Sequence, residues 1–232
     1  MKIIQIIAVL LLPLLSFADN IAEIKKSAEA GSADAQLLLG NAYRTGSEGI
    51  IQNFTTAFEW YSKSAEQSNQ IAQYYIYDAF NNGIGVQQNI AAANAILLKL
   101  ANEGDANSQS RLGLQYYGHV LRFQNQLAET NQLIQANAIQ AYYWFSLASS
   151  KSSKNQLPAL FEARDLVLQI LTPMNQQTAQ KFASEFKPKP KSPLFVSTDG
   201  IRNSTFFTNS AKNIKIQTNV LLFKTTPQQT SP

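Results

Sequence analysis

The stretches SADAQLLLGNAYRTG (Ser32–Gly46) and NQIAQYYIYDAFNNG (Asn69–Gly83) are two copies of one pattern, and they lie 37 residues apart. When the two copies are aligned, Gln36 falls on Gln73. A third, less regular copy begins at Asp105. Repetition with a period of roughly 20–50 residues is typical of repeat arrays, in which each unit packs on its neighbours. The pattern therefore predicts a repeat protein.

Each copy has the signals expected at the two ends of a helix. Ser32, Asn69 and Asp105 stand at the same place, and their side chains can accept hydrogen bonds from the free amides of a first helical turn. Gly46 and Gly83 follow the apolar run, where a glycine can adopt the left-handed conformation of a helix exit. These signals predict one helix at the start of each repeat.

A second helix is expected after each of these first helices. The segments FTTAFEWYSKSAEQ and IAAANAILLKLANE follow Asn53 and Asn89, which are good helix caps. Small residues on one side of these segments allow close helix packing, and large residues fill the layer between repeats. The sequence thus predicts an all-α fold, an α-solenoid of antiparallel helix hairpins.

The third repeat is longer than the others. Its glycine turn is missing between Gly118 and Ala138, which indicates an insertion that forms either a longer loop or an added helical turn. The second-helix pattern returns at Ala141–Ser149. An amphipathic segment follows at Leu157–Leu171. A further helix is expected to begin at Thr172-Pro173, a cap followed by a proline in the first helical position.

The chain can be divided on these grounds into a leader, a repeat domain and a tail. The predicted parts are a signal peptide (1–18), a helical repeat domain (19–186) made of a half-repeat (21–31), two repeats (32–68 and 69–104), an extended repeat (105–150) and capping helices (156–186), and a tail (187–232). The tail begins with KPKPKSP, which favours an extended spacer. We expect a chain ending at Phe186 to keep its melting temperature, and we expect a strand at Asn213–Phe223 only with a partner.

The leader predicts export. Lys2 precedes an apolar run from Ile3 to Leu15, and Ser16-Phe17-Ala18 resembles a cleavage site, so we expect cleavage after Ala18 and a periplasmic or secreted protein. A membrane anchor is the alternative, but the run is short for a span of about 20 residues. We expect no transmembrane segment in the mature chain.

Composition excludes several functional classes. The sequence contains no cysteine, so disulfides, thiolate metal sites and cysteine nucleophiles are excluded. The net charge is +4, but seven of the basic residues and only one acid lie after Phe186, so the repeat domain is slightly acidic. We therefore expect no nucleic-acid partner. We also expect no cofactor and no metal.

The assembled pattern resembles the Sel-one-like repeat family, relatives of the tetratricopeptide repeat. The residues that carry the resemblance are ADAQLLLGNAYRTG with NFTTAFEWYSKSA, and IAQYYIYDAFNNGIGV with NIAAANAILLKLA. Tyr77 departs from the pattern because the family prefers glycine there. The resemblance implies an all-helical, right-handed solenoid that acts as a protein-interaction scaffold, in bacteria often at the envelope.

Catalytic residues are not evident. The single histidine, His119, can form neither a multi-histidine metal site nor a triad by itself. Glu162 and Asp165 are close on a helix, but Arg164 favours a salt-bridged surface. Gly83-Ile84-Gly85 lacks the preceding strand of a phosphate loop and is better explained as a turn between helices.

Aromatic residues give the only candidate binding site. Tyr43, Phe80 and Tyr116 share one repeat position and are expected in the core between repeats. Tyr74, Tyr77 and Tyr117 lie outside that register, and together with His119 they are the predicted partner-binding residues. Aromatic side chains on the concave face of a solenoid would anchor a peptide.

The favoured function is a non-enzymatic scaffold that binds a protein or peptide on the concave face and is itself a monomer. One alternative is a hydrolase or binding protein directed at cell-wall or β-lactam compounds, although the cysteines of the relatives linked to β-lactams are missing. Another alternative is a regulatory subunit of an envelope enzyme.

Overall fold

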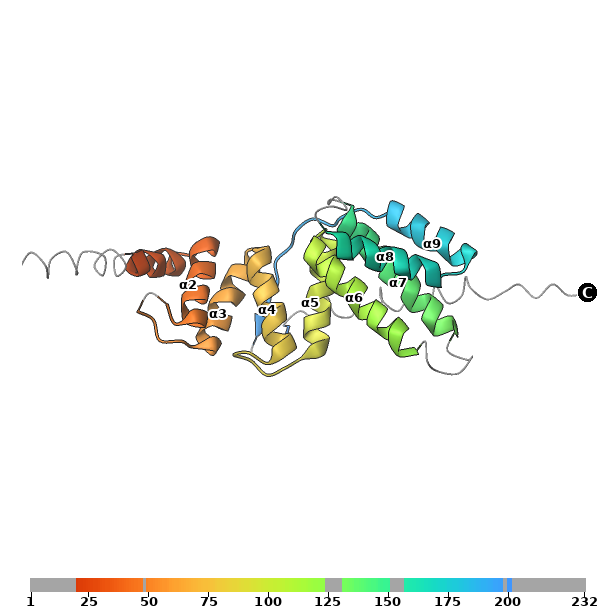
Figure 1. Ribbon diagram of the computed structural model, residues 1–232. Helices are drawn as coiled ribbons and strands as arrows, with labels where there is room; N and C mark the ends of the chain where they lie inside the picture. The colour runs from red at the N-terminus through yellow and green to blue at the C-terminus, as the bar shows by residue number, and fades with distance from the viewer. Residues whose placement is uncertain (1–19, 48, 124–130, 151–156, 198–199, 202–232) are drawn as a thin grey trace, which may run out of the picture. The chain divides into compact units, whose positions relative to one another are not determined.

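The computed structural model describes residues 20–47, 49–123, 131–150, 157–197 and 200–201, which form two compact units. The first unit contains the described residues up to Ile96 together with those from Lys191 onward, and the second contains Leu97–Pro190. A helix over residues 20–29 opens the first unit. The following helices are α2 (Ala33–Thr45), α3 (Phe54–Glu66), α4 (Gln70–Asn82), α5 (Ile90–Asn102), α6 (Ala106–Phe123), α7 (Asn131–Ser149), α8 (Pro158–Ile170) and α9 (Pro173–Ser184) (Figure 1).

Capping side chains fix where the helices begin. The Ser32 hydroxyl accepts from the Ala35 amide at 3.4 Å, and Asp105 Oδ1 accepts from the Ser108 amide at 2.7 Å. The other predicted caps make the same bond, namely Asn53, Asn69, Asn89 and Thr172. The predicted helix starts are therefore confirmed, because the free amides of each first turn find the expected side-chain acceptor.

The turn between the two helices of a hairpin is built in the same way twice. Gly46 and Gly83 end α2 and α4 with φ of 69° and 71°. Beyond them the Asn53 amide donates to the Tyr43 carbonyl, and the Asn89 amide donates to the Phe80 carbonyl, each at 2.8 Å. Because the two bonds are equivalent in position, the repeat predicted from the sequence is also a repeat of backbone hydrogen bonds.

The extended repeat gains helical turns. Helices α6 and α7 have 18 and 19 residues, whereas α2, α3, α4 and α5 have 13 each. His119 occupies the position that aligns with Gly46, and α6 continues through it to Phe123. Of the two predicted forms of the insertion, added helical turns are present. Residues 124–130 lie outside the described part of the chain.

Each unit has its own core. In the first unit, Ala28, Leu39 and Ile50 are buried, with Tyr43 packed against them. In the second unit, a cluster joins α6 to α9, and it contains Val120, Ala138, Ile139, Ala141, Phe145, Val167, Leu171 and Ala179, with Tyr116 packed against it. The predicted core roles of Tyr43 and Tyr116 are confirmed, and Phe80 is also buried.

Helix glycines allow two aromatic rings to pack directly on a helix backbone. A Cβ at Gly40 would lie 2.6 Å from the Tyr61 ring, and one at Gly113 would lie 2.5 Å from the Phe145 ring. Real Cβ atoms do not approach so closely, so only glycine fits at these two positions. The large residues of the second helix thus fill the space that a missing side chain leaves on the first.

The beginning of the tail differs from the prediction. The sequence predicts a free spacer without contacts to the repeats, but the Lys189 amide donates to the Asn102 carbonyl at 2.8 Å and the Leu194 amide to the Ala65 carbonyl at 3.0 Å. Carbonyls in the last turn of a helix lack helical partners, and an extended segment can supply the missing donors. Truncation after Phe186 is therefore expected to lower the melting temperature.

A short hairpin follows this segment. Strand β1 (Val196–Ser197) pairs with β2 (Gly200–Ile201) in antiparallel register. The predicted signal peptide and the strand considered at Asn213–Phe223 lie outside the described residues. In the described part of the chain, regular structure apart from this hairpin is helical, and none of its helices is long and apolar enough to cross a membrane.

Candidate functional site

Two of the four predicted binding residues lie in α4. Tyr77 is only 3% exposed, so the expectation that its ring anchors a partner at the surface is corrected. In the alignment of the repeats, Tyr77 falls on Gly40 and Gly113. Leu97, which is smaller, falls on Tyr61 and Phe145, the residues whose rings pack on those two glycines. Tyr74 is half-buried, with its ring centroid 5.5 Å from that of Tyr77.

The other two predicted binding residues lie in α6 and belong to the second unit. Tyr117 is half-buried and packs against the core cluster of that unit. His119 is exposed where α6 continues past the position of a glycine exit. These four residues are divided between the two compact units, two in each. Whether any of them binds a partner stays a prediction.

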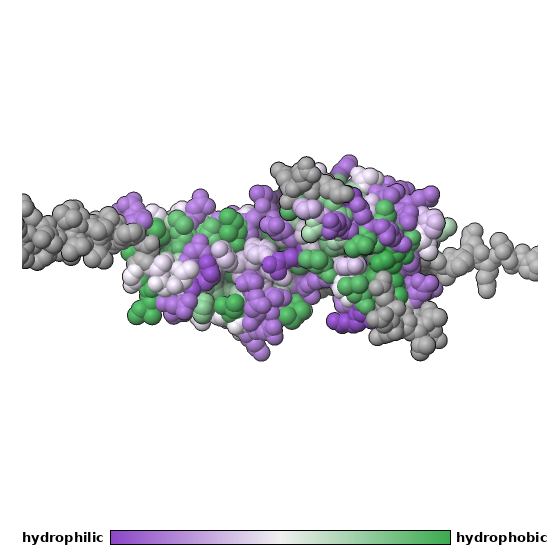
Figure 2. All heavy atoms as spheres, in the orientation of Figure 1, coloured by the Kyte–Doolittle hydropathy of each residue, from purple (hydrophilic) through white to green (hydrophobic). Residues whose placement is uncertain are grey.

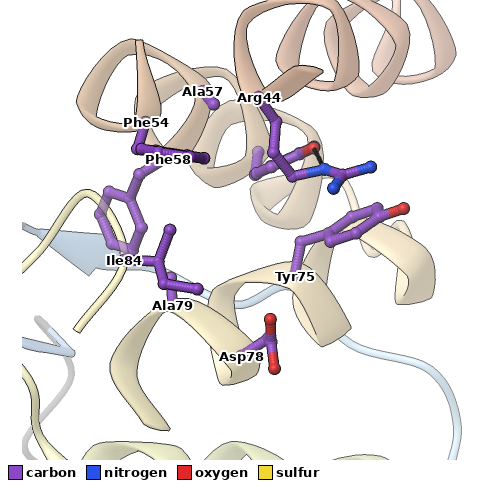
Figure 3. Close-up of a pocket in the computed structure, with 9 residues that line it drawn as sticks. Arg44, Phe54, Ala57, Phe58, Tyr75, Asp78, Ala79 and Ile84 are labelled. Carbon is purple, nitrogen blue, oxygen red and sulfur yellow. Dashed lines mark hydrogen bonds between the residues drawn. The ribbon is translucent and has the colours of Figure 1, made fainter. Parts of the chain in front are cut away.

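A hollow in the first unit is a better-defined candidate site. It has a volume of about 110 Å³ and is lined by Arg44, Phe54, Ala57, Phe58, Tyr61, Tyr75, Asp78, Ala79 and Ile84. Figure 3 shows Phe54, Phe58 and Ile84 on one side and Arg44, Tyr75 and Asp78 on the other. The hollow therefore has an apolar side and a polar side.

Tyr61 holds the polar side in place. Its hydroxyl donates to Asn41 Oδ1 at 2.8 Å and accepts from Arg44 Nε at 3.2 Å. Its ring stacks on that of Tyr75, with centroids 4.6 Å apart. Burial raises the pKa of Tyr61 to about 12, although the hydrogen bond from Arg44 acts in the opposite direction. The hydroxyl thus stays protonated and positions the arginine.

Arg44 and Asp78 supply charge at the edge of the hollow. The Arg44 guanidinium carbon lies 5.2 Å from the centre of the Tyr75 ring, a distance typical of a cation–π contact. Asp78 Oδ1 accepts from Asn82 Nδ2 at 2.8 Å, which orients the carboxylate. A cation, a carboxylate and an aromatic ring at one edge can bind polar groups of a partner by hydrogen bonds and ion pairs.

The apolar side is partly open to solvent. Phe54 is 41% and Ile84 38% exposed, while Phe58 is buried. Gly85 brings the loop close to α3, because a Cβ there would lie 2.3 Å from the Phe54 carbonyl oxygen. On the face drawn in Figure 2, apolar side chains are interspersed with polar ones. Exposed apolar groups beside a hollow are typical of binding sites.

The volume limits what the hollow can hold. Pockets for drug-sized molecules have about 300–1,000 Å³. At about 110 Å³, this one is suited to a single side chain of a partner protein. The pair of aromatic rings, the arginine and the apolar wall together suit a residue with an apolar body and a polar end.

Sequence reasoning missed this site. Tyr75 belongs to the run of tyrosines in the second repeat, but it aligns with Leu38, and Arg44 aligns with Asn81. The polar residues of the hollow are thus not repeated, and a search for repeated positions passes over them. A usable signal was present in the chain, since residues that break a repeat without a packing reason are candidates for function.

Two further polar features are explained by folding. In the second unit, Gln135 Oε1 accepts from the Thr172 amide at 3.0 Å and from Asn175 Nδ2 at 2.9 Å, which joins α7 to the start of α9 beside a second hollow of about 200 Å³. Lys99 Nζ lies 2.8 Å from Glu103 Oε1, with both side chains buried. Burial lowers the pKa of Lys99, while Glu103 opposes that shift.

The acidic residues of α8 and the glycines after α4 have structural roles. Asp165 Oδ1 accepts from Arg164 Nη2 at 2.7 Å, so the predicted salt bridge on that surface is present. Gly83 and Gly85 both have positive φ in the turn after α4, in agreement with the predicted turn. Among the described residues, no group of three or more His, Cys, Asp and Glu side chains could hold a metal ion.

Known proteins share the repeat. The family model described as Sel1 repeat matches residues 33–69, 71–105 and 121–153. Protein SHC1 of Saccharomyces cerevisiae, in strains S288c and YJM789, is 26% identical over 145 residues, which cover 62% of this chain and 27% of that protein. The chain thus spans about a quarter of the length of these curated relatives.

Two solved structures match this chain with low similarity scores. A Sel1 repeat protein from Oxalobacter formigenes has 20% identity and a TM-score of 0.43, and the match covers 73% of this chain and 79% of that one. The protective antigen c5321 of uropathogenic Escherichia coli, with an SLR fold, has 22% identity and a TM-score of 0.42, with coverage of 83% and 43%.

Proposed function

Because the chain belongs to the Sel1 repeat family, we propose that it is a non-enzymatic module that binds a protein or peptide partner through the hollow of the first unit. Sel1 repeats generally mediate protein–protein interaction. The observation that carries the proposal is the combination of the stacked Tyr61–Tyr75 pair, the Arg44 guanidinium and the half-exposed Phe54 and Ile84 around one small hollow.

The expected ligand is one side chain of an exposed peptide segment. An aromatic or long aliphatic residue with a polar end would place its apolar body against Phe54 and Ile84, and its polar end beside Arg44 and Asp78. Buried aromatic and arginine contacts dominate binding energy in many interfaces. Tyr75 and Arg44 are therefore expected to contribute most to binding.

A random-peptide display library provides a test that does not require the partner to be identified first. Peptides selected on the wild type should share one aromatic or long aliphatic residue. Tyr75→Ala should weaken their binding by about 2 kcal/mol, roughly a thirtyfold loss, because truncating an anchor residue typically has such an effect. Ile71→Ala is the matched control, since Ile71 is 59% exposed on the same helix and does not line the hollow.

A labelling experiment can locate the site directly. The chain has no cysteine, so a single Ile84→Cys substitution carries a photo-crosslinker to the hollow alone. The selected peptide should crosslink to this variant and not to the Ile71→Cys variant. Equal crosslinking at both positions, or peptide binding that survives Tyr75→Ala and Arg44→Ala in folded protein, would refute the assignment.

Export belongs to the same proposal. The basic residue, apolar run and small residues of positions 1–18 support a periplasmic or secreted protein. Expression of the full chain with a C-terminal tag, followed by cell fractionation and N-terminal sequencing, checks it. A mature chain that begins at Asp19 in the periplasm or medium is the expected outcome, and an uncleaved chain in the cytoplasm would contradict it.

A further inference from the structure

A segment of the tail occupies an edge of the first unit in the manner of a bound peptide. The Leu194 amide donates to the Ala65 carbonyl at 3.0 Å. Gln73 Nε2 donates to the Ser192 carbonyl at 2.9 Å, although the two residues are 119 positions apart in the chain. Both backbone polar groups of an extended segment, amide and carbonyl, are thus recognised by the end of α3 and the start of α4.

Side chains of this segment alternate between the protein and solvent. Leu194 and Val196 are 3% and 4% exposed, whereas Phe195 between them is 42% exposed and Pro193 is also exposed. Alternation with a period of two is the property of an extended chain bound along one side. Leu194 and Val196 are therefore the side chains of this segment that are turned away from solvent, and Phe195 is turned toward it.

The carbonyl that accepts a hydrogen bond from this segment lies at the end of a helix. Ala65 lies in the last turn of α3, where carbonyls have no partner within the helix, and its oxygen also accepts from the Ser68 amide. A helix C-terminus carries partial negative charge, which favours cations nearby. Lys191, at the start of the segment, is exposed and is the basic residue closest to it in sequence.

Gln73 makes a hydrogen bond that recurs at the same position of each repeat. Gln36, Gln73 and Gln109 each donate from Nε2 to the carbonyl of the residue eight positions earlier, at 3.1, 3.2 and 2.9 Å. At Gln73 the same amide nitrogen also donates to Ser192. The side chain is fully buried and held by the fold, so it presents a fixed donor to an extended chain.

We propose that the edge formed by Ala65 and Gln73 is a binding site for an extended peptide segment of another protein, with aliphatic residues at alternate positions after a basic residue. The segment Lys191–Val196 is then an intramolecular ligand that competes with this partner. The edge shares no residue with the hollow lined by Tyr75 and Arg44, so the two sites can be tested separately.

Tethering explains how the segment can exclude other peptides. A flexible link of moderate length gives a tethered ligand an effective concentration on the order of millimolar. A free peptide of equal intrinsic affinity must reach that concentration to displace it. Wild-type protein is therefore expected to bind such a peptide weakly, and protein whose own segment is released is expected to bind it well.

The test uses a labelled synthetic peptide with the sequence of residues 189–197 and measures fluorescence anisotropy. In the full chain, Leu194→Asp combined with Val196→Asp releases the segment, and the peptide should bind this variant at least about tenfold more tightly than it binds the wild type. Phe195→Asp is the matched control and should leave binding at the wild-type level. A peptide carrying Leu194→Asp should not bind any variant, whereas one carrying Phe195→Ala should bind as before.

A second measurement, hydrogen exchange, is made on the wild-type protein and so does not depend on how a variant folds. In wild-type protein, hydrogen exchange at the Leu194 amide should be slow, and a saturating amount of the unlabelled peptide should accelerate it. No acceleration, together with no peptide binding to a released variant that melts cooperatively, would overturn the proposal. Dimerisation of the wild type through exchange of this segment would also overturn it, because the edge would then belong to a second copy. Binding at the hollow, tested by Tyr75→Ala, is unaffected by any of these outcomes.

Discussion

In the first repeat the ring of Tyr61 packs on Gly40, and in the third repeat the ring of Phe145 packs on Gly113. The two contacts have the same geometry, but only the first carries a hydroxyl, which binds Asn41 and Arg44. In the third repeat, Leu114 aligns with Asn41 and is exposed. The repeats thus share a packing solution, and the polar arrangement beside the hollow is specific to the first.

The same two repeats end their first helices differently. Helix α2 stops at Gly46 in a left-handed conformation, whereas α6 continues through His119 for the rest of its 18 residues. Glycine tolerates positive φ at little cost, which allows the helix exit at Gly46. The exit glycine of the first repeat is thus replaced by a histidine where the third repeat has a longer helix.

The largest effect is expected where a ring covers a helix glycine. Gly113→Ala would place a Cβ 2.5 Å from the buried Phe145 ring, so the ring or the helix must move. Overpacking of this kind costs about 1–3 kcal/mol, and we expect the upper part of that range in chemical denaturation. Gly40→Ala should cost a similar amount, because Tyr61 is equally close.

Gly118 provides the control for this prediction on the same helix. A Cβ there meets nothing within 4 Å. Since alanine is favoured over glycine inside a helix by roughly 0.5–1 kcal/mol, Gly118→Ala should stabilise the protein. If both substitutions in α6 changed stability in the same direction, close ring packing on Gly113 would not be the reason for its glycine.

A smaller effect of opposite origin is expected at the helix exits. Gly46→Ala forces a side chain into a conformation with φ of 69° and should cost about 1–2 kcal/mol. At the aligned position of the third repeat, His119→Gly introduces the glycine instead, and it should cost about 0.5 kcal/mol because the residue is inside a helix. Thermal melting of both variants measures the difference.

The comparison of the two helix ends would fail if His119→Gly raised the melting temperature. A stabilising His119→Gly substitution would mean that α6 is held in its extended form against its local preference. A loss of helical circular dichroism in this variant, without a change in Gly46→Ala, would locate the effect in α6. Gly83→Ala, with φ of 71°, repeats the first measurement in the second repeat and should agree with Gly46→Ala.

Much of the fold could be predicted from the sequence because local signals determine it. Side-chain caps such as Asn69 and exit glycines such as Gly83 act within a few residues, and the structure confirms them. The burial of Tyr77 could not be predicted in this way. Whether a side chain on a helix is buried depends on the residues that pack on it from other helices, and those residues are distant in sequence.

The candidate site and the tail were harder to predict for a related reason. Tyr75 and Arg44 come together only when α2, α3 and α4 pack, and their positions are not equivalent in the repeat. The KPKPKSP segment has a composition typical of a free spacer. Its contacts depend on helix-end carbonyls such as that of Ala65, which a sequence pattern does not show.

A pH-dependent effect concerns the hydroxyl that distinguishes Tyr61 from Phe145. The ordinary pKa of tyrosine is near 10, and burial raises the pKa of Tyr61 to about 12. Between these values the unfolded chain loses its proton and the folded chain keeps it, so the free energy of unfolding falls as pH rises from 10 to 12 and is unaffected by this group below pH 10. Tyr61→Phe should therefore make the free energy of unfolding fall less between pH 10 and 12.

A second tyrosine, Tyr143, also contributes to the loss of stability at alkaline pH, and it provides a comparison for Tyr61. Burial also raises the pKa of Tyr143 to about 12, so Tyr143→Phe should reduce the loss by a comparable share. At neutral pH the two variants should differ, because Tyr61→Phe also removes the hydrogen bonds to Asn41 and Arg44, at a cost of about 1 kcal/mol. Melting temperature as a function of pH, with phenolate absorbance to count the tyrosines that titrate late, measures both effects. An unchanged slope between pH 10 and 12 in Tyr61→Phe would show that this hydroxyl does not keep its proton in the folded chain over that range.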